Sequence, residues 1–259
     1  MKGIILYFSG TGNTKFVATK IAEEFRKNGC EIDMHSIEEK IDLKDFSYDY
    51  LILGFPKYFE YIPKIFFEFL DDNLFDSLKE VKTMIFSTGK DKAKAYFNEL
   101  EKKLLIKNYK VIVTKNFQMP DSYTLSKGYK MVKGKELREI FDKSLAEIKD
   151  TVVNFLTDNY MKEEISEIKS SIYKTINKFK TKDLYKNSMR FSVNSNCDKC
   201  NLCVNSCPTN NIENIAGEIK FRDNCIMCCR CVNACPKNAI MYNEKEHSQY
   251  KENIDLIVG

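Results

Sequence analysis

The sequence of 259 residues lacks tryptophan and has only two histidines, His35 and His247. One lies in a predicted strand and the other near the end of the sequence, so they assemble neither a catalytic triad nor a histidine-rich metal site. No apolar run approaches the roughly 18 residues of a membrane-spanning helix. The first residues form no signal-peptide core, so we expect the protein to stay in the cytoplasm.

The sequence also lacks a strong excess of either charge. Its 41 Lys and Arg residues and 37 Asp and Glu residues are interleaved and leave a formal net charge of +4. No basic patch emerges, so we expect no nucleic-acid partner. The hydrophobic fraction of 43% is large enough to fill a core, and the length predicts one large or two modest domains.

Cysteine is almost absent from the first three quarters of the sequence, which contain only Cys30, whereas nine of the ten cysteines fall between Cys197 and Cys235. Eight of the nine form two runs with the spacing CxxCxxCxxxCP. These eight residues are Cys197, Cys200, Cys203 and Cys207, then Cys225, Cys228, Cys231 and Cys235. The second run repeats the first run at an offset of 28 residues, which indicates an internal duplication.

The spacing of the cysteines favours an iron-sulfur cluster over other uses of thiols. Steps of two residues let three thiolates surround one face of an iron-sulfur cubane, and the fourth ligand must come from elsewhere. Zinc and disulfides are the alternatives, but a structural zinc site uses two cysteine pairs separated by a longer loop. Cys229 has Asn201 as its counterpart, so we interpret it as a small buried thiol and keep Cys228 as the ligand.

The first 157 residues alternate apolar runs with amphipathic stretches, the pattern of a parallel sheet covered by helices. The strand candidates are residues 4–8, 31–36, 50–55, 83–87 and 109–113. Helices are predicted at residues 13–28, 63–71 and 92–106 and over a long stretch from Leu137 to Leu156. The pattern predicts a five-stranded doubly wound parallel α/β sheet, whose ligands bind at the carboxyl ends of the strands.

The loop after the first strand has the composition of a phosphate site. It contains two glycines, three hydroxyl side chains and an amide, and it opens a helix. Backbone amides at a helix N-terminus attract phosphate, and glycine permits close approach. The triphosphate motif GxxxxGK[ST] is absent, and Lys15 occupies the third glycine position of GxGxxG, so a monophosphate fits better. An ordinary tight turn is the alternative.

The same loop resembles the FMN phosphate loop of flavodoxins. The matching residues are Ser9, Thr11, Gly12 and Thr14, and Asn13 lies within the match. The loop after the third strand, Gly54, Phe55, Pro56, Lys57 and Tyr58, resembles the flavodoxin loop beside the flavin ring. This resemblance implies that Tyr58 stacks on the ring. The loop after the fourth strand, Ser87, Thr88, Gly89 and Lys90, would offer amides to the polar edge of the ring.

The cysteine-rich segment resembles bacterial two-cluster ferredoxins, a small α+β domain in which the fourth cysteine of each run ligates the other cluster. The resemblance implies one [4Fe-4S] cluster on Cys197, Cys200, Cys203 and Cys235 and a second on Cys225, Cys228, Cys231 and Cys207. Nearly the whole chain is thus similar to flavodoxin-ferredoxin fusion proteins of anaerobes. It implies a flavodoxin-like domain at residues 1–157, a helical connector at 158–190, a ferredoxin domain at 191–243 and a C-terminal tail at 244–259.

The resemblance implies an electron carrier or oxidoreductase component that binds FMN and two [4Fe-4S] clusters and links one-electron and two-electron redox partner proteins. The alternative is an FMN-dependent oxidoreductase that reduces a quinone, nitro compound or disulfide. A third alternative is an iron sensor that binds no FMN. A continuous connector helix would be long enough to hold the two modules apart, so we also expect a head-to-tail homodimer. The insertion at residues 118–134 belongs to neither resemblance.

Overall fold

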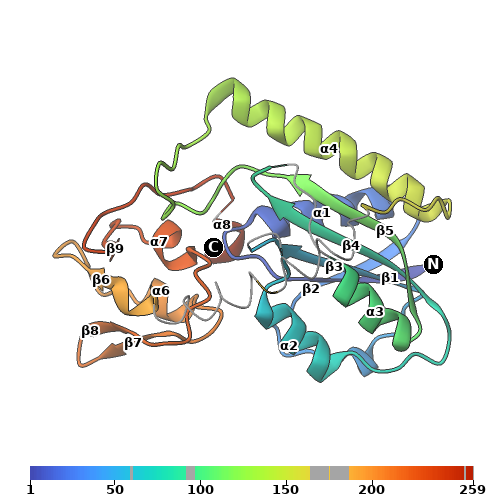
Figure 1. Cartoon of the computed structure of the whole chain (residues 1–259), viewed down its shortest axis with the longest axis horizontal. Helices are drawn as coiled ribbons and strands as arrows, with labels where there is room; N and C mark the ends of the chain where they lie inside the picture. The colour runs from blue at the N-terminus through green and yellow to red at the C-terminus, as the bar shows by residue number, and fades with distance from the viewer. Residues whose placement is uncertain (59–60, 92–96, 164–174, 176–186, 254, 259) are drawn as a thin grey trace. The chain divides into compact units, whose positions relative to one another are not determined.

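The computed structural model describes the chain except residues 59–60, 92–96, 164–174, 176–186, 254 and 259 (Figure 1). The chain divides into two compact units. The first comprises Met1–Ser9, Thr14–Pro120 and Gly134–Lys174, and the second comprises Gly10–Asn13, Asp121–Lys133 and Thr175–Gly259. Most of the predicted connector helix and the start of the helix predicted at 92–106 lie outside the described residues.

The first unit is built on a five-stranded parallel sheet, as the sequence predicts. Its strands are β1 (Lys2–Tyr7), β2 (Glu31–Ser36), β3 (Tyr50–Pro56), β4 (Val81–Gly89) and β5 (Tyr109–Gln118). They lie in the order β2-β1-β3-β4-β5, and every neighbouring pair is parallel. The strand order reverses between β1 and β3, and in doubly wound sheets this switch point is where ligands bind.

Helices cover both faces of this sheet (Figure 1). They are α1 (Asn13–Lys27), α2 (Lys64–Asn73), α3 (Asn98–Ile106) and α4 (Gly134–Leu156), and a 3-10 turn spans Leu43–Asp45. One face packs against α1 and α4, where Phe25 makes aromatic contacts with Tyr50 of β3 and Phe155 of α4. On the other face Phe55 contacts Phe66 of α2.

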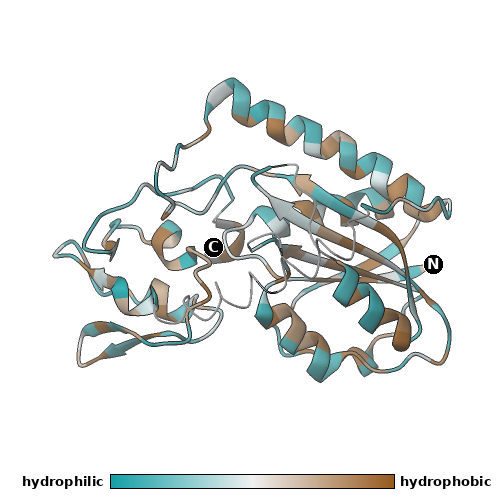
Figure 2. Ribbon diagram, viewed as in Figure 1, coloured by the Kyte–Doolittle hydropathy of each residue, from teal (hydrophilic) through white to brown (hydrophobic). Residues whose placement is uncertain are grey.

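The helices are amphipathic, and the strands are apolar on both faces. In Figure 2 hydrophobic and hydrophilic residues alternate around α4, which buries Ile148, Val152 and Phe155. Five of the six residues of β1 are buried, as expected of a strand covered on both sides. β5 continues to Gln118, past its apolar run, because buried Thr114 and Asn116 extend the ladder with β4.

The second unit contains two small antiparallel sheets and short helices. The sheets pair β6 (Phe191–Val193) with β9 (Ile240–Tyr242) and β7 (Ile212–Ile215) with β8 (Glu218–Phe221). The helices are α6 (Leu202–Asn205), α7 (Arg230–Ala234) and α8 (Asp255–Val258), and a 3-10 turn spans Ser188–Arg190. An apolar cluster that includes Phe191, Val232 and Leu125 forms its core, so the insertion between β5 and α4 contributes to this unit.

The backbone of the second unit shows the duplication that the cysteine spacing indicates. Asn201 before α6 and Cys229 before α7 both adopt left-handed conformations, with φ of 62° and 60°. Asn210 and Asn238 also match, with φ of 51° and 46°. Asparagine tolerates this conformation better than most residues, so three of the four positions carry a residue suited to it. Among the described residues, no helix is long and apolar enough to cross a membrane.

Candidate cofactor sites

The loops after β1 and β4 meet at the carboxyl edge of the sheet. The hydroxyl of Thr14 lies 2.8 Å from that of Thr88, and both side chains are buried. Ser9, only 1% exposed, accepts a hydrogen bond from the Lys15 backbone amide at 3.2 Å. Ser87 donates to Asn116 at 2.9 Å. The structure therefore brings the predicted first and third loops together at the switch point.

The loop after β3 joins the same edge. The Lys57 amide donates to the carbonyl of Thr88 at 2.9 Å, and the amide of Tyr58 donates to the Tyr61 carbonyl at 2.8 Å. The Lys57 side chain is 4% exposed, and its ammonium lies 2.7 Å from Asp91. Lys57 is thus buried and paired with a carboxylate, rather than solvated. A Cβ on Gly89 would lie 2.2 Å from Cε of Lys57, so glycine makes room for this side chain.

The loop residues Gly10–Asn13 belong to the second unit by their contacts. Thr11 donates from its hydroxyl to that of Ser122 at 2.7 Å. Gly12 has a φ of +97°, a backbone conformation that other residues rarely adopt. The loop holds hydroxyls, an amide and glycine backbone and carries no carboxylate. This donor set suits a phosphate monoester.

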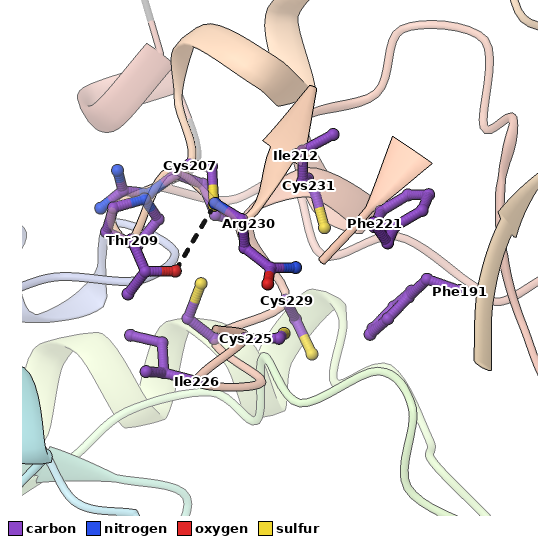
Figure 3. A pocket seen from close by; sticks show the side chains of 13 residues that line it. Phe191, Cys207, Thr209, Ile212, Phe221, Cys225, Ile226, Cys229, Arg230 and Cys231 are labelled. Carbon is purple, nitrogen blue, oxygen red and sulfur yellow. Dashed lines mark hydrogen bonds between the residues drawn. The ribbon is translucent and has the colours of Figure 1, made fainter. Parts of the chain in front are cut away.

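The two cysteine runs meet around one cavity. Cys225, Cys228 and Cys231 line it together with Cys207 of the first run, and Cys229 lines it as well. Figure 3 shows the sulfur atoms of Cys207, Cys225 and Cys231 on different sides of this cavity. We call it the second cavity.

A matching cavity lies at the other end of the duplication, and we call it the first cavity. Cys197, Cys200 and Cys203 line it together with Cys235 of the second run. Each cavity therefore takes three cysteines from one run and the distant cysteine from the other. The resemblance to two-cluster ferredoxins implies the same partition.

Backbone amides point at the sulfur atoms of these cysteines. The amide of Asn211 donates to Cys207 Sγ at 3.2 Å, and that of Ala239 donates to Cys235 Sγ at 3.3 Å. The Met227 amide donates to Cys225 Sγ at 3.3 Å. Donors to sulfur stabilise the thiolate, which is the form that binds iron. The donor set of each cavity thus fits an anionic cluster.

Burial opposes ionisation of several of these thiols. It raises the pKa of Cys203 to about 11 and that of Cys225 to about 12. A metal that binds here must displace protons from thiols that would otherwise keep them at neutral pH. Cys229 is 3% exposed, packs in the apolar cluster and directs its thiol to the Met227 carbonyl at 3.6 Å. These surroundings agree with its interpretation as a small buried thiol.

All ten cysteines lie in the described part of the chain, and none forms a disulfide. In the same part, no three His, Cys, Asp or Glu side chains converge as they would on a single ion. The thiolates of a [4Fe-4S] cluster bind different iron atoms and need not converge on one point.

Several residues at these sites were not predicted from the sequence. Arg230 of α7 is 3% exposed and donates to the carbonyls of Gly10 at 3.0 Å and Ser206 at 2.7 Å. Asn233 is fully buried and joins Ser122 and Tyr250 through its amide. The only sequence signal was the position of both residues inside the second cysteine run.

Comparison with known proteins agrees with both resemblances. A flavodoxin domain model matches residues 4–126, and a 4Fe-4S dicluster domain model matches residues 190–236. No curated protein matches the chain. Among solved structures, Megasphaera elsdenii flavodoxin is 23% identical with a TM-score of 0.40, covering 56% of this chain and 98% of that one. Bacillus cereus flavodoxin 2 is 17% identical with a TM-score of 0.43, covering 61% and 99%.

The fold and the cysteine pattern define an electron-transfer flavo-iron-sulfur protein. The chain carries a flavodoxin domain followed by a 4Fe-4S dicluster domain, the arrangement of a flavodoxin-ferredoxin fusion.

Proposed function

We propose that the chain passes electrons between two [4Fe-4S] clusters and one FMN, and so links one-electron and two-electron redox partners. FMN exchanges electrons one or two at a time, whereas a [4Fe-4S] cluster exchanges one. The observation that carries the proposal is the partition of the eight cysteines of the two runs, three and one, between two cavities. A single cluster or a structural zinc site would not need two such sets.

The chain would supply the ligands of the clusters and would bind and orient the FMN. The first cavity's cysteines would hold one cluster and the second cavity's cysteines the other. Residues 9 and 11–14 would bind the FMN phosphate through hydroxyls, an amide and backbone donors. Residues 54–58 and 87–90 would face the flavin ring, with Tyr58 stacked on it. The amides that donate to Cys207 and Cys235 would stabilise the sulfur charge of the clusters.

Anaerobic purification followed by metal, sulfide and flavin analysis tests the proposal directly. We expect about eight iron atoms per chain, the number in two cubanes, together with one FMN and a visible spectrum of both groups. Colourless protein after reconstitution, or zinc in place of iron, would refute the cluster assignment. Iron without any FMN would instead support the iron-sensor alternative.

A matched pair of cysteine variants tests the ligand sets. Cys207→Ser should remove about half of the iron while the FMN content stays unchanged, because Cys207 is assigned to the second cluster. Cys229→Ser should keep all the iron, because Cys229 lies outside the repeated spacing and directs its thiol to the Met227 carbonyl. Equal iron loss in the two variants would contradict the assignment.

The alternative function, reduction of a quinone, nitro compound or disulfide by bound FMN, makes a different prediction. An enzyme of this kind would sustain turnover with a soluble small acceptor, whereas a carrier would react with protein partners. Steady-state assays with these three acceptor classes therefore separate the two functions. The redox partners, the cytoplasmic location and the homodimer stay predictions.

A further inference from the structure

The segment at residues 249–253 is anchored on α7 and the end of the second cysteine run. Gln249 donates from its amide to the carbonyl of Cys235 at 2.8 Å. The backbone amide of Tyr250 donates to Oδ1 of Asn233 at 2.9 Å. The ammonium of Lys251 donates to the carbonyl of Asn233 at 2.6 Å. These bonds hold the segment along its length.

The same segment contacts the glycine-rich loop Gly10–Asn13, which belongs to the same unit. The Tyr250 hydroxyl donates to Oδ1 of Asn13 at 2.5 Å, and Nδ2 of Asn253 donates to the same oxygen at 2.8 Å. Tyr250 is 2% exposed, and both asparagines are 7% exposed. Burial raises the pKa of Tyr250 above its ordinary value, so its hydroxyl keeps the proton that it donates.

Two donors on one amide oxygen fix the orientation of the Asn13 side chain. The oxygen and the NH₂ group of an amide lie on opposite sides of its carbon, and they exchange places only if the amide rotates. Tyr250 and Asn253 hold the oxygen toward themselves, so the NH₂ group faces the other way. An NH₂ group is a donor, which is what a phosphate requires.

The backbone of the loop is held from the same side. A Cβ on Gly12 would lie 1.8 Å from the carbonyl oxygen of Asn253, so only glycine permits this approach. On Gly10, the carbonyl accepts a hydrogen bond from Arg230 at 3.0 Å. The bonds to Asn13 and Gly10 use acceptor atoms of the loop, whereas an anion is bound by donors. These contacts therefore support a phosphate site rather than compete with it.

We propose that Tyr250 and Asn253 are positioning residues for the phosphate of FMN, and that they act by orienting the amide of Asn13. This inference rests on the proposed function, because it needs an FMN site at residues 9–14. It goes further by assigning residues outside the flavodoxin-like segment to the recognition of one chemical group. Tyr250 and Asn253 would have no role in the binding of the flavin ring.

The test compares two ligands that differ only by the phosphate. Full-length protein with intact clusters is freed of flavin anaerobically and titrated with FMN and with riboflavin, and the quenching of flavin fluorescence gives each Kd. Tyr250→Phe and Asn253→Ala should each weaken FMN binding about five-fold, the usual effect of one lost hydrogen bond. Both variants should bind riboflavin as the wild type does. Glu252→Gln, at an exposed position of the same segment, should bind both flavins unchanged.

A double-mutant cycle tests whether Asn13 transmits the effect. In an Asn13→Ala background, Tyr250→Phe should no longer change the affinity for FMN. Unchanged FMN affinity in both single variants, or equal weakening for FMN and riboflavin, would overturn the inference and leave the proposed function standing. A wild-type protein that binds neither flavin would overturn the proposed function and this inference with it.

Discussion

Replacement of Asn233 by alanine should destabilise the second unit far more than the same replacement at Asn205, its counterpart in the first repeat. Asn233 is fully buried, whereas Asn205 is exposed. The Asn233 amide donates to the carbonyl of Ser122 at 3.1 Å and accepts from the amide of Tyr250 at 2.9 Å. A longer contact of 3.4 Å comes from the hydroxyl of Thr124.

The magnitude follows from the groups that the substitution leaves buried without Asn233. A buried donor or acceptor that loses its partner costs about 1–3 kcal/mol. The two shorter bonds therefore give a loss of about 2–6 kcal/mol, and the longer contact adds little. An exposed polar side chain such as Asn205 should change stability by less than about 0.5 kcal/mol.

Urea unfolding under anaerobic conditions, followed by the visible absorbance of the clusters, measures the difference. With a slope of about 2 kcal/mol per molar urea, the middle of the usual range, the midpoint for Asn233→Ala should fall by about 1–3 M. The midpoint for Asn205→Ala should move by a few tenths of that. Equal shifts in the two variants would refute the argument, because they would show that the buried amide contributes nothing beyond its exposed counterpart.

Three further predictions concern the first unit and the insertion. Lys57 and Asp91 form an ion pair at the candidate ring loops. Lys57→Gln should therefore lower the FMN midpoint potential, and Asp91→Asn should raise it. Shifts of the same sign in potentiometry would contradict this expectation. Thr14→Val leaves the buried Thr88 hydroxyl without its partner, and the unfolding free energy should fall by about 1 kcal/mol while the FMN Kd rises. Leu125→Ala removes a side chain from the apolar cluster, so it should cost about 2–3 kcal/mol and speed chelator-induced bleaching of the clusters; unchanged bleaching would count against that packing.

The fold of the first unit was predictable because each of its strands carries its own local signal. The strand predicted at residues 31–36 has the observed bounds. The apolar run that begins at Ile4 ends within one residue of the end of β1. β4 and β5 extend beyond their predicted ends because a neighbouring strand supplies hydrogen bonds to polar residues there. Pairing with another strand leaves no trace in the local pattern of the sequence.

The insertion shows where local patterns stop being informative. The sequence resemblances left out residues 118–134, but the flavodoxin domain model extends into them as far as residue 126. Their polar composition predicts only a loop. In the structure, Asp121–Lys133 belongs to the second unit, and Leu125 packs in its apolar cluster. One apolar side chain in a polar stretch carries no periodicity, so its partner could not be inferred.

The cysteine ligand candidates could be chosen from spacing alone because thiols around a cubane are set by steps of two and three residues. The residues that support the phosphate loop could not be chosen in this way. Tyr250 and Asn13 are separated by 237 positions, and Asn253 and Asn13 by 240. A tyrosine or an asparagine near the end of a sequence is ordinary, and only the fold identifies its partner.

The two repeats keep the same backbone but have diverged in what surrounds it. Asn201 and Cys229 share the left-handed conformation, yet Asn201 is half-buried and Cys229 is buried in the apolar cluster. Asn205 is exposed, whereas Asn233 holds both the insertion and the segment at residues 249–253. A duplication alone would give two equivalent halves, so the differences reflect contacts added around the second run. Those contacts include the bond from Arg230 to the glycine-rich loop and the bonds of Asn233 to the insertion and to the segment at residues 249–253. They explain why the two matched asparagines should respond so differently to the same substitution.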